Sequence, residues 1–261
     1  MALVDSFERN GNILFKHRGQ IPVLIFIAGL IAVSYTKPVL YCSSVEENAA
    51  TITLTVVAIL VSVAGMVVRA YTIGTTPHGT SGRNTDKQLA KQLNTKGIYS
   101  MVRHPLYLGN YLMWAGLLIY TMNLPLFIIV SLVYWLYYER IMFAEERYLE
   151  REFGDTYREW SLKVPAFLPA FRKFEKGDIS FSMRSVLRRE YSGFFALVLG
   201  FVAIDYIRAY VLWKEFGTGC CLNSFPIRPS LIILIVAFVI TITLRTLKHH
   251  SKILSSEENR D

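Results

Sequence analysis

Six apolar stretches, each close to the roughly 20 residues that cross a bilayer as a helix, constrain this chain more than any other feature. They lie at residues 21–41, 49–71, 104–122, 124–143, 191–213 and 228–247. The intervals between them contain no soluble domain of appreciable size, and 52% of all residues are hydrophobic. This pattern predicts an all-α, multi-pass transmembrane helical bundle of about six spans.

The third and fourth stretches are separated only by a turn at residues 123–125, so we expect an antiparallel hairpin. If all six stretches cross, 24 of the 28 Lys and Arg residues fall on the side where this hairpin begins and ends. The positive-inside rule then predicts that both termini and both hairpin ends face the cytoplasm. The membrane would be a bacterial inner membrane or the endoplasmic reticulum. The net charge of +8 reflects this topology and is not a nucleic-acid signal, because no soluble basic domain carries it.

Several smaller features give narrower expectations. The interval 72–97 is glycine-rich in its first half, which indicates a loop, and its second half indicates a short amphipathic helix. Asp205 and Arg208 are spaced to pair on one helix face.

Aromatic residues near one end of the fourth stretch are typical of an interfacial belt: Tyr134, Trp135, Tyr137 and Tyr138. The three cysteines fall on the non-cytoplasmic side, where two of them could form a disulfide or all three remain thiols: Cys42, Cys220 and Cys221.

The entry to the hairpin reads GIYSMVRHPLYLG at residues 97–109. Pro105 is favoured in the first turn of a helix, so Arg103 and His104 stand at the helix mouth. Tyr107 follows within the first turns, and Gly109 allows close backbone approach. A cation, an imidazole and a phenol at a membrane edge indicate either a functional site or ordinary interfacial anchoring.

The exit from the hairpin reads EERYLEREFGDTYREWSLKVPAFLP at residues 145–169. Glu145 and Glu146 follow the apolar run directly, and two adjacent carboxylates at the depth of Arg103 can counter a cation. Hydrophobic residues then recur every three to four positions, which predicts a cytoplasmic amphipathic helix on the membrane surface, bent near Gly154.

Taken together, these two segments resemble the isoprenylcysteine carboxyl methyltransferase and phospholipid methyltransferase superfamily of integral membrane enzymes. The hallmark of that superfamily is G-x-Y-x-x-x-R-H-P-x-Y-x-G, a hairpin, E-E-x-x-L-x-x-x-F-G-x-x-Y and a terminal V-P-x-x-x-P. Every hallmark position occurs here at the expected spacing, over residues 97–169.

The resemblance implies S-adenosylmethionine-dependent methyl transfer to a lipid or lipidated substrate that arrives from the bilayer. It implies catalytic roles for Arg103, which would face an acidic group of the acceptor, and for Glu146. The residues implied to bind or enclose the cofactor are His104, Tyr107, Gly109, Glu145, Glu146 and Tyr157. The spacing does not choose between Glu145 and Glu146, and no metal is expected.

The chain continues for about 90 residues beyond the point where compact members of the family end. We therefore expect three regions: residues 1–96, a methyltransferase core at 97–170, and a basic loop with a two-span extension at 171–261. Arg103 favours O-methylation of a carboxylate or phosphate. The alternatives are N-methylation of a phospholipid amine, hydride transfer from NADPH by a sterol-type membrane reductase, and a non-enzymatic membrane scaffold or transporter.

Overall fold

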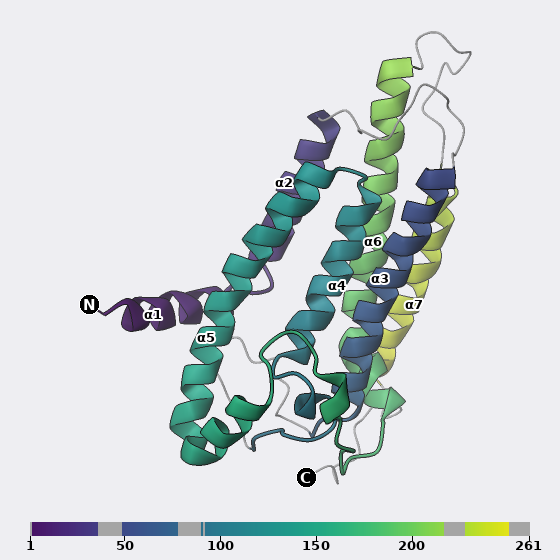
Figure 1. The fold of residues 1–261 in the computed structure, drawn as a ribbon. Helices are drawn as coiled ribbons and strands as arrows, with labels where there is room; N and C mark the ends of the chain where they lie inside the picture. The colour runs from purple at the N-terminus through teal and green to yellow at the C-terminus, as the bar shows by residue number, and fades with distance from the viewer. Residues whose placement is uncertain (1, 36–48, 78–89, 91, 217–227, 251–261) are drawn as a thin grey trace.

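The computed structural model describes residues 2–35, 49–77, 90, 92–216 and 228–250, with only the backbone of 212–216. Within these ranges the chain forms seven α-helices and two single-turn 3₁₀ helices (Figure 1). The helices are α1 (Leu3–Lys16), α2 (Ile21–Tyr35), α3 (Ala49–Gly74), η1 (Ile98–Ser100), α4 (Pro105–Tyr120), α5 (Leu124–Lys163), η2 (Phe171–Lys173), α6 (Met183–Phe216) and α7 (Ser230–His250). The prediction of an all-α protein is confirmed.

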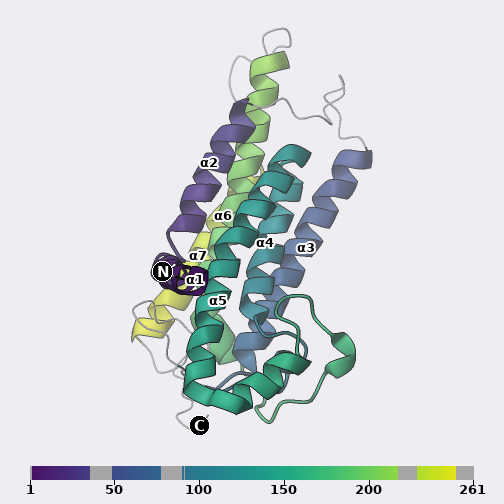
Figure 2. The same cartoon turned by 60° about the vertical axis from the view of Figure 1, so that its left-hand side comes forward.

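Helices α2 to α7 run alongside one another as a bundle, and α1 projects from its side (Figures 1 and 2). Each predicted apolar stretch overlaps one of these six helices over the residues that the structure describes. By length and composition, α3, α5, α6 and α7 can each cross a membrane alone, and α1 with α2, bent by 78°, would form a fifth span. Helix α4 has 16 residues and packs against α3, α5 and α6. The arrangement agrees with the predicted bundle of about six spans.

Small residues allow α3 and α4 to pack very closely. A Cβ atom added at Gly109 would lie 2.9 Å from Gly65 O and 2.6 Å from Arg69 Cγ, both on α3. Further along, a Cβ at Gly116 would overlap Ser62. Small residues at helix contacts are typical of membrane proteins, because they let backbones approach where burial of apolar surface gives little driving force. The close approach expected at Gly109 is therefore made by α3.

The turn between α4 and α5 is as short as the sequence predicts. Asn123 caps α5, since its side-chain oxygen accepts a hydrogen bond of 3.0 Å from Leu126 N. Pro125 occupies the first turn of α5, where no backbone donor is needed. The two helices form the predicted antiparallel hairpin, and α4 begins at the end of the bundle where α5 ends (Figure 1). This end, which contains Arg103, His104, Glu145 and Glu146, is called here the charged end.

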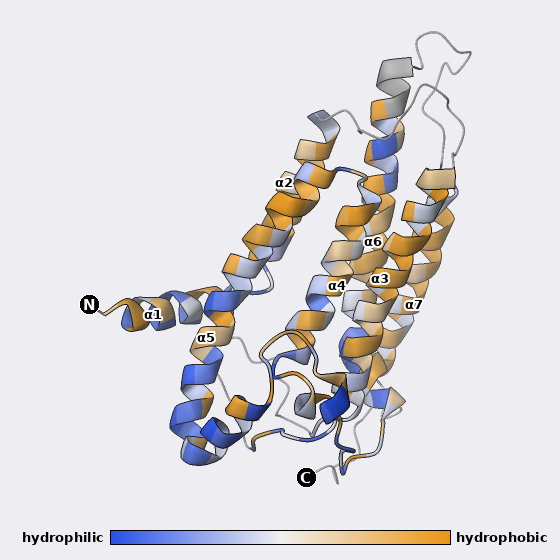
Figure 3. Ribbon diagram, viewed as in Figure 1, coloured by the Kyte–Doolittle hydropathy of each residue, from blue (hydrophilic) through white to orange (hydrophobic). Residues whose placement is uncertain are grey.

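Helix α5 changes direction beyond its apolar part. Gly154 has φ 55° and ψ −127°, a conformation that side chains other than glycine rarely adopt, and the helix bends there. Figure 3 shows the apolar part of α5 in the bundle and the hydrophilic part at the charged end. The predicted bend near Gly154 is confirmed, and it turns the last helical residues back towards α4.

Three of the four aromatic residues assigned to an interfacial belt are buried, so that prediction is wrong for them. Tyr134, Tyr137 and Tyr138 are 4–8% exposed and belong to a hydrophobic cluster with Tyr107, whereas Trp135 is 43% exposed. Positions 134, 137 and 138 share one helix face, and that face is turned into the bundle. Composition alone does not distinguish a belt from a buried aromatic stripe.

The C-terminal extension is joined to the rest of the bundle by polar contacts. Arg69 on α3 donates two hydrogen bonds of 2.7 Å to Glu190 on α6. At the opposite end, Arg228 contacts Asp205 at 2.8 Å, and Arg208 donates to Tyr120 O at 3.1 Å. Asp205 thus has an ion-pair partner, Arg228, at the start of the last span. The predicted pairing of Asp205 with Arg208 stays a prediction.

Some predictions concern residues outside the described ranges. These include the three cysteines and most of the glycine-rich loop, of which residues 78–89 and 91 are not described. The described residues 92–96 are not helical, so the amphipathic helix predicted for this interval does not extend through them. The division of the chain into three regions stays a prediction.

Candidate active site

Backbone hydrogen bonds bring the two motif segments together at the charged end. Arg103 N donates to Pro165 O at 2.9 Å, and His104 N donates to Ala166 O at 3.1 Å. Ala170 N donates to Met101 O at 2.9 Å, which extends this pairing. The terminal V-P-x-x-x-P segment therefore holds the irregular residues that precede α4. These bonds fix the backbone positions of Arg103 and His104, and so the points from which their side chains extend.

Arg103 and His104 converge on one carboxylate of α5. Arg103 Nη2 lies 3.0 Å from Glu146 Oε1, and His104 Nε2 lies 2.8 Å from the same oxygen. Because a carboxylate only accepts, His104 donates from Nε2 in this contact. Arg103 also donates through Nη1 to Ser161 O at 2.7 Å. Glu146 is thus held by a guanidinium and an imidazole, both from the mouth of α4.

The second carboxylate has a different set of partners. The Tyr107 hydroxyl donates to Glu145 Oε1 at 2.7 Å. His104 Nδ1 lies 3.7 Å from Glu145 Oε2, so the imidazole stands between the two carboxylates. A second guanidinium, that of Arg18, lies 3.9 Å from Glu145 Oε1. The structure therefore separates two glutamates that the sequence could not distinguish.

These two carboxyl groups, which follow the apolar part of α5, differ in acidity. Burial raises the pKa of Glu145, and the neighbouring negative charge of Glu146 adds to the rise against the opposing effect of His104. Burial also tends to raise the pKa of Glu146. The hydrogen bond from His104, the charge of His104 and the charge of Arg103 outweigh this effect and hold the pKa of Glu146 below the usual value. Sites commonly give two like groups different roles in this way.

An aromatic wall closes the apolar side of the site. The Tyr107 ring lies 4.9 Å from that of Tyr138 and 5.7 Å from that of His104, between centroids. Tyr134 donates its hydroxyl to Tyr107 O at 3.0 Å, and Phe167 from the V-P-x-x-x-P segment belongs to the same cluster. Faces of aromatic rings attract cations, so this wall suits a positively charged ligand group.

Two buried polar atoms beside Glu146 have no hydrogen-bond partner among the residues that the structure describes. They are Arg103 Nε and, by strict hydrogen-bond geometry, the hydroxyl of Tyr157, a buried residue whose hydroxyl nevertheless interacts with the Glu146 carboxylate. Buried polar groups are nearly always paired, so the unpaired Nε donor of Arg103, beside a cluster of charges, indicates a place for a bound acceptor group. A ligand with both cationic and hydrogen-bonding groups, such as S-adenosylmethionine, fits these residues.

The structure brings most of the predicted site residues together, with one exception. Arg103, His104, Tyr107 and the two glutamates form a connected cluster, and Tyr157 lies beside it. Gly109 lies two residues after Tyr107, on the opposite face of α4, where it contacts α3. We therefore assign Gly109 to helix packing.

Sequence reasoning missed two contributors to this site. Arg18 was counted only among the positive charges that set the topology, although it stands close to Glu145. Asn110 accepts a hydrogen bond of 2.5 Å from Arg69, which anchors α4 one turn beyond Tyr107. No local sequence pattern identifies either residue as part of a site. For Arg18, the available signal is its position as a charged residue at the border of an apolar stretch, which often indicates function.

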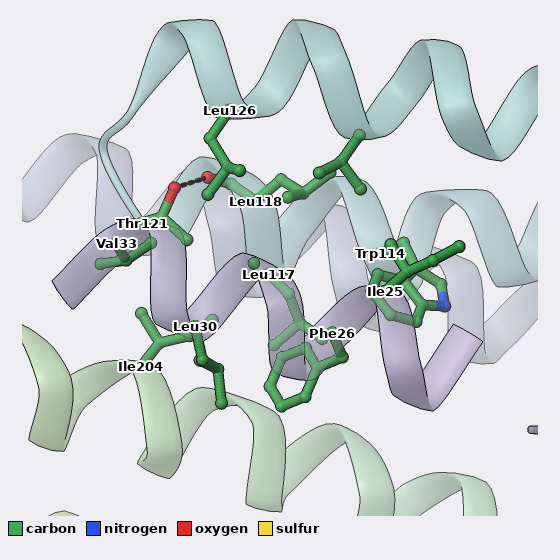
Figure 4. Close-up of a pocket in the computed structure, with 12 residues that line it drawn as sticks. Ile25, Phe26, Leu30, Val33, Trp114, Leu117, Leu118, Thr121, Leu126 and Ile204 are labelled. Atoms are coloured by element: carbon green, nitrogen blue, oxygen red, sulfur yellow. Dashed lines mark hydrogen bonds between the residues drawn. The ribbon is translucent and has the colours of Figure 1, made fainter. Parts of the chain in front are cut away.

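A separate apolar cavity lies further along α4, beside the hairpin turn (Figure 4). It has a volume of about 310 Å³ including its open mouth, and it is lined by residues of α2, α4, α5 and α6. Its polar lining residue Thr121 donates its hydroxyl to Leu118 O at 2.6 Å. With no titratable side chain, this cavity suits only apolar groups, so the polar chemistry belongs to the charged end.

Comparisons with known proteins agree with the motifs. Residues 49–156 match the phospholipid methyltransferase family. The chain is 37% identical over 89 residues to protein-S-isoprenylcysteine O-methyltransferase of Schizosaccharomyces pombe, an alignment of 34% of this chain and 36% of that protein. It is 32% identical over 116 residues to the Saccharomyces cerevisiae protein of that name, covering 44% and 48%.

The similarity extends to a bacterial protein with a different name. The nickel-cobalt-cadmium resistance protein NccN of Alcaligenes xylosoxydans xylosoxydans is 35% identical over 83 residues, covering 32% of this chain and 38% of that protein. The chain thus spans little more than a third of the length of the first relatives that it matches. No solved structure matches it. The resemblance read from residues 97–169 is confirmed for this part of the chain.

Proposed function

We propose that this chain, which resembles the phospholipid methyltransferase family over residues 49–156, is an integral membrane methyltransferase that uses S-adenosylmethionine. The observation that carries the proposal is the cluster of Arg103, His104 and Tyr107 on one hairpin mouth with Glu145 and Glu146 on the other. Each of these residues matches the hallmark of the superfamily. The names of the relatives support the same reaction type.

The chemistry of the residues supports particular roles. S-adenosylmethionine supplies, when bound, a methyl group on a sulfonium, and transfer to a carboxylate removes one positive and one negative charge. Glu145, at the aromatic wall, would hold the cofactor's cationic part, and Tyr107 would orient that carboxylate. Glu146 would fix Arg103 and His104. The protein's work is then alignment of two charged groups in a site that excludes water.

The acceptor that we propose is a carboxylate on a lipidated substrate. Arg103 carries a planar, permanently charged fork that suits carboxylates, and its Nε atom is buried without a partner in the described part of the chain. The relatives named protein-S-isoprenylcysteine O-methyltransferase support a lipidated carboxyl group. An amine acceptor would gain nothing from a guanidinium beside its nucleophile, although Arg103 could bind a neighbouring phosphate.

We also propose that the charged end faces the cytoplasm. The asymmetry of Lys and Arg supports this orientation. The cofactor would then enter from the aqueous side, and the lipidated acceptor would enter from the bilayer. External labelling of Cys220 or Cys221 in intact cells, after reduction, is expected, whereas labelling only after permeabilisation would reverse the orientation.

The test is methyl transfer by the protein purified into lipid nanodiscs. Methyl-labelled S-adenosylmethionine is supplied with a prenylcysteine peptide, its carboxamide analogue or phosphatidylethanolamine. We expect label on the free carboxylate only, and binding of the cofactor by calorimetry. Label on phosphatidylethanolamine alone would establish N-methylation in place of O-methylation. No label on any acceptor together with no cofactor binding would refute the proposed function.

A further inference from the structure

The amphipathic helix α1, which lies outside the segment that matches the family, is docked on α5 next to the site. Its Gly11 packs against the backbone of Arg140, where any side chain would clash. Tyr137 donates its hydroxyl to Leu14 O at 3.2 Å, and Phe15 is buried in the aromatic cluster that contains Tyr107. Packing, backbone and aromatic contacts therefore fix one face of α1.

Charged contacts hold the other end of the same helix. Arg151 donates to Glu8 Oε1 at 2.6 Å, and Arg147 lies 3.9 Å from the second oxygen of Glu8. The guanidinium of Arg140 stacks on Phe7, 3.3 Å from the ring centroid. Three arginines of α5, at and just before the charged end, thus contact α1. An amphipathic helix that only lies on the membrane surface is held by lipid and needs no such contacts with the protein.

The docking of α1 determines where Arg18 lies. Arg18 stands in the short connection between α1 and α2, and its guanidinium covers the ring of the buried Phe15 at 4.0 Å. This stacking directs Nη1 to within 3.9 Å of Glu145 Oε1. The Arg18 side chain is 15% exposed and that of Glu145 is 24% exposed, so water screens the pair only partly.

We propose that Arg18 is a positioning residue of the site, and that α1 serves to hold its guanidinium against Glu145. In this role Arg18 keeps the Glu145 carboxylate ionised and oriented when no cofactor is bound. The N-terminal helix is then a functional part of the enzyme. The assignment of Glu145 to the cofactor's cation rests on the proposed function, whereas the coupling of Arg18 to Glu145 does not.

Several other groups act on Glu145, and they define what the test must separate. They are His104 and Tyr107 from α4, Tyr99 from η1, and the adjacent Glu146. Burial raises the pKa of Glu145, and the positive charge of Arg18 opposes that rise. Loss of this charge must therefore raise the pKa further, so Glu145 becomes protonated at a higher pH.

The first measurement is the infrared absorption of the protonated Glu145 carboxyl in nanodiscs as a function of pH. The band is identified by its loss in Glu145→Gln. We expect Arg18→Gln to move its midpoint to higher pH and Arg18→Lys to restore most of the shift. The matched control is Lys16→Gln, which removes the same charge from an exposed position of α1. Equal midpoints in the wild type and Arg18→Gln would overturn the proposal.

The second measurement is calorimetric binding of S-adenosylmethionine between acidic and neutral pH. Arg18 favours ionised Glu145 but also repels a cation bound there, so its removal has two opposing effects on affinity. Two unit charges about 4 Å apart interact by about 1 kcal/mol in water, so we expect the affinity of Arg18→Gln relative to the wild type to fall by roughly fivefold between neutral and acidic pH. Lys16→Gln should bind as the wild type does. If the wild type binds no cofactor, the proposed function fails, and the infrared titration still decides the coupling. An infrared shift with a ratio of wild-type to Arg18→Gln affinity that does not change with pH would refute the role in cofactor binding.

Discussion

Tyr107 and Glu145 lie 38 positions apart in the chain, yet the phenol donates to the Glu145 carboxylate at 2.7 Å. The hairpin turn brings them together, because it returns α5 to the end of the bundle where α4 begins. Tyr107 also contributes its ring to the aromatic wall, next to Tyr138. One side chain thus orients the carboxylate and shapes the space in front of it.

Replacement of Tyr107 with Phe separates these two contributions. The ring and its packing remain, but Glu145 loses a hydrogen bond to a charged group, which is typically worth about 1.5–3 kcal/mol. We expect cofactor affinity to fall by about tenfold, because Glu145 is no longer held in place, and Tm to fall as well, because the free protein loses the same hydrogen bond. Calorimetry and thermal unfolding in detergent test this prediction. The matched control is Tyr111→Phe, which removes the hydroxyl from a neighbouring ring of the same cluster.

Replacement of Glu146 with Gln should strongly reduce methyl transfer. Arg103 and His104 both depend on this carboxylate, and removal of one partner of a partly buried charge pair costs about 2–5 kcal/mol. We expect activity to fall by at least 30-fold. Glu159→Gln, an exposed change on the same helix, should leave activity within twofold of the wild type. Equal activity of the two variants would remove Glu146 from the site.

Much of this arrangement follows from local patterns in the sequence. Hydrophobic stretches gave the six helices of the bundle, a short polar turn gave the hairpin, and Gly154 gave the bend. The proximity of Arg103 to Glu146 was implied by the two motifs, because both hairpin ends must open on one side. These features depend on residues that are close in the sequence and on the length of a hydrophobic stretch. Both properties are visible in the sequence itself.

The remaining features depend on contacts between distant segments. The different surroundings of Glu145 and Glu146 come from Tyr107 on α4 and from Arg18 in the connection between α1 and α2. The burial of Tyr134 depends on the face of α5 that meets α4, and hydropathy does not report that face when both sides are apolar. Sequence periodicity is weakest where a helix is apolar all round.

Replacement of Glu190 with Gln should destabilise the bundle more than it alters the chemistry. Glu190 is 6% exposed and accepts two hydrogen bonds from Arg69, whose charge would then have no carboxylate. Breaking such a buried pair costs about 3–5 kcal/mol. We expect a clearly lower Tm in detergent. The double change Arg69→Met with Glu190→Met should recover part of the loss, and an equal or larger loss in the double variant would contradict the ion-pair explanation.

Replacement of Gly154 with Ala tests the bend in α5. No neighbouring atom lies within 4 Å of the added Cβ, so the cost comes from backbone conformation alone. A strained residue at positive φ costs about 1–3 kcal/mol. We expect reduced stability and weaker pairing of residues 164–170 with 101–104, seen as faster amide hydrogen exchange there. Gly29→Ala also has free space around the Cβ but lies within a regular helix. It should be neutral or slightly stabilising.

The ion pair between Arg69 and Glu190 has a consequence for biosynthesis. The partners are 121 residues apart, so Arg69 leaves the ribosome well before its carboxylate is made. At about 5–20 residues per second, the delay is roughly 6–24 seconds. During that time α3 and α4 lie in or near the bilayer with an uncompensated guanidinium between them. The last helices to be translated therefore complete an assembly that the first ones begin, and a nascent chain halted before α6 would be a substrate for membrane quality control.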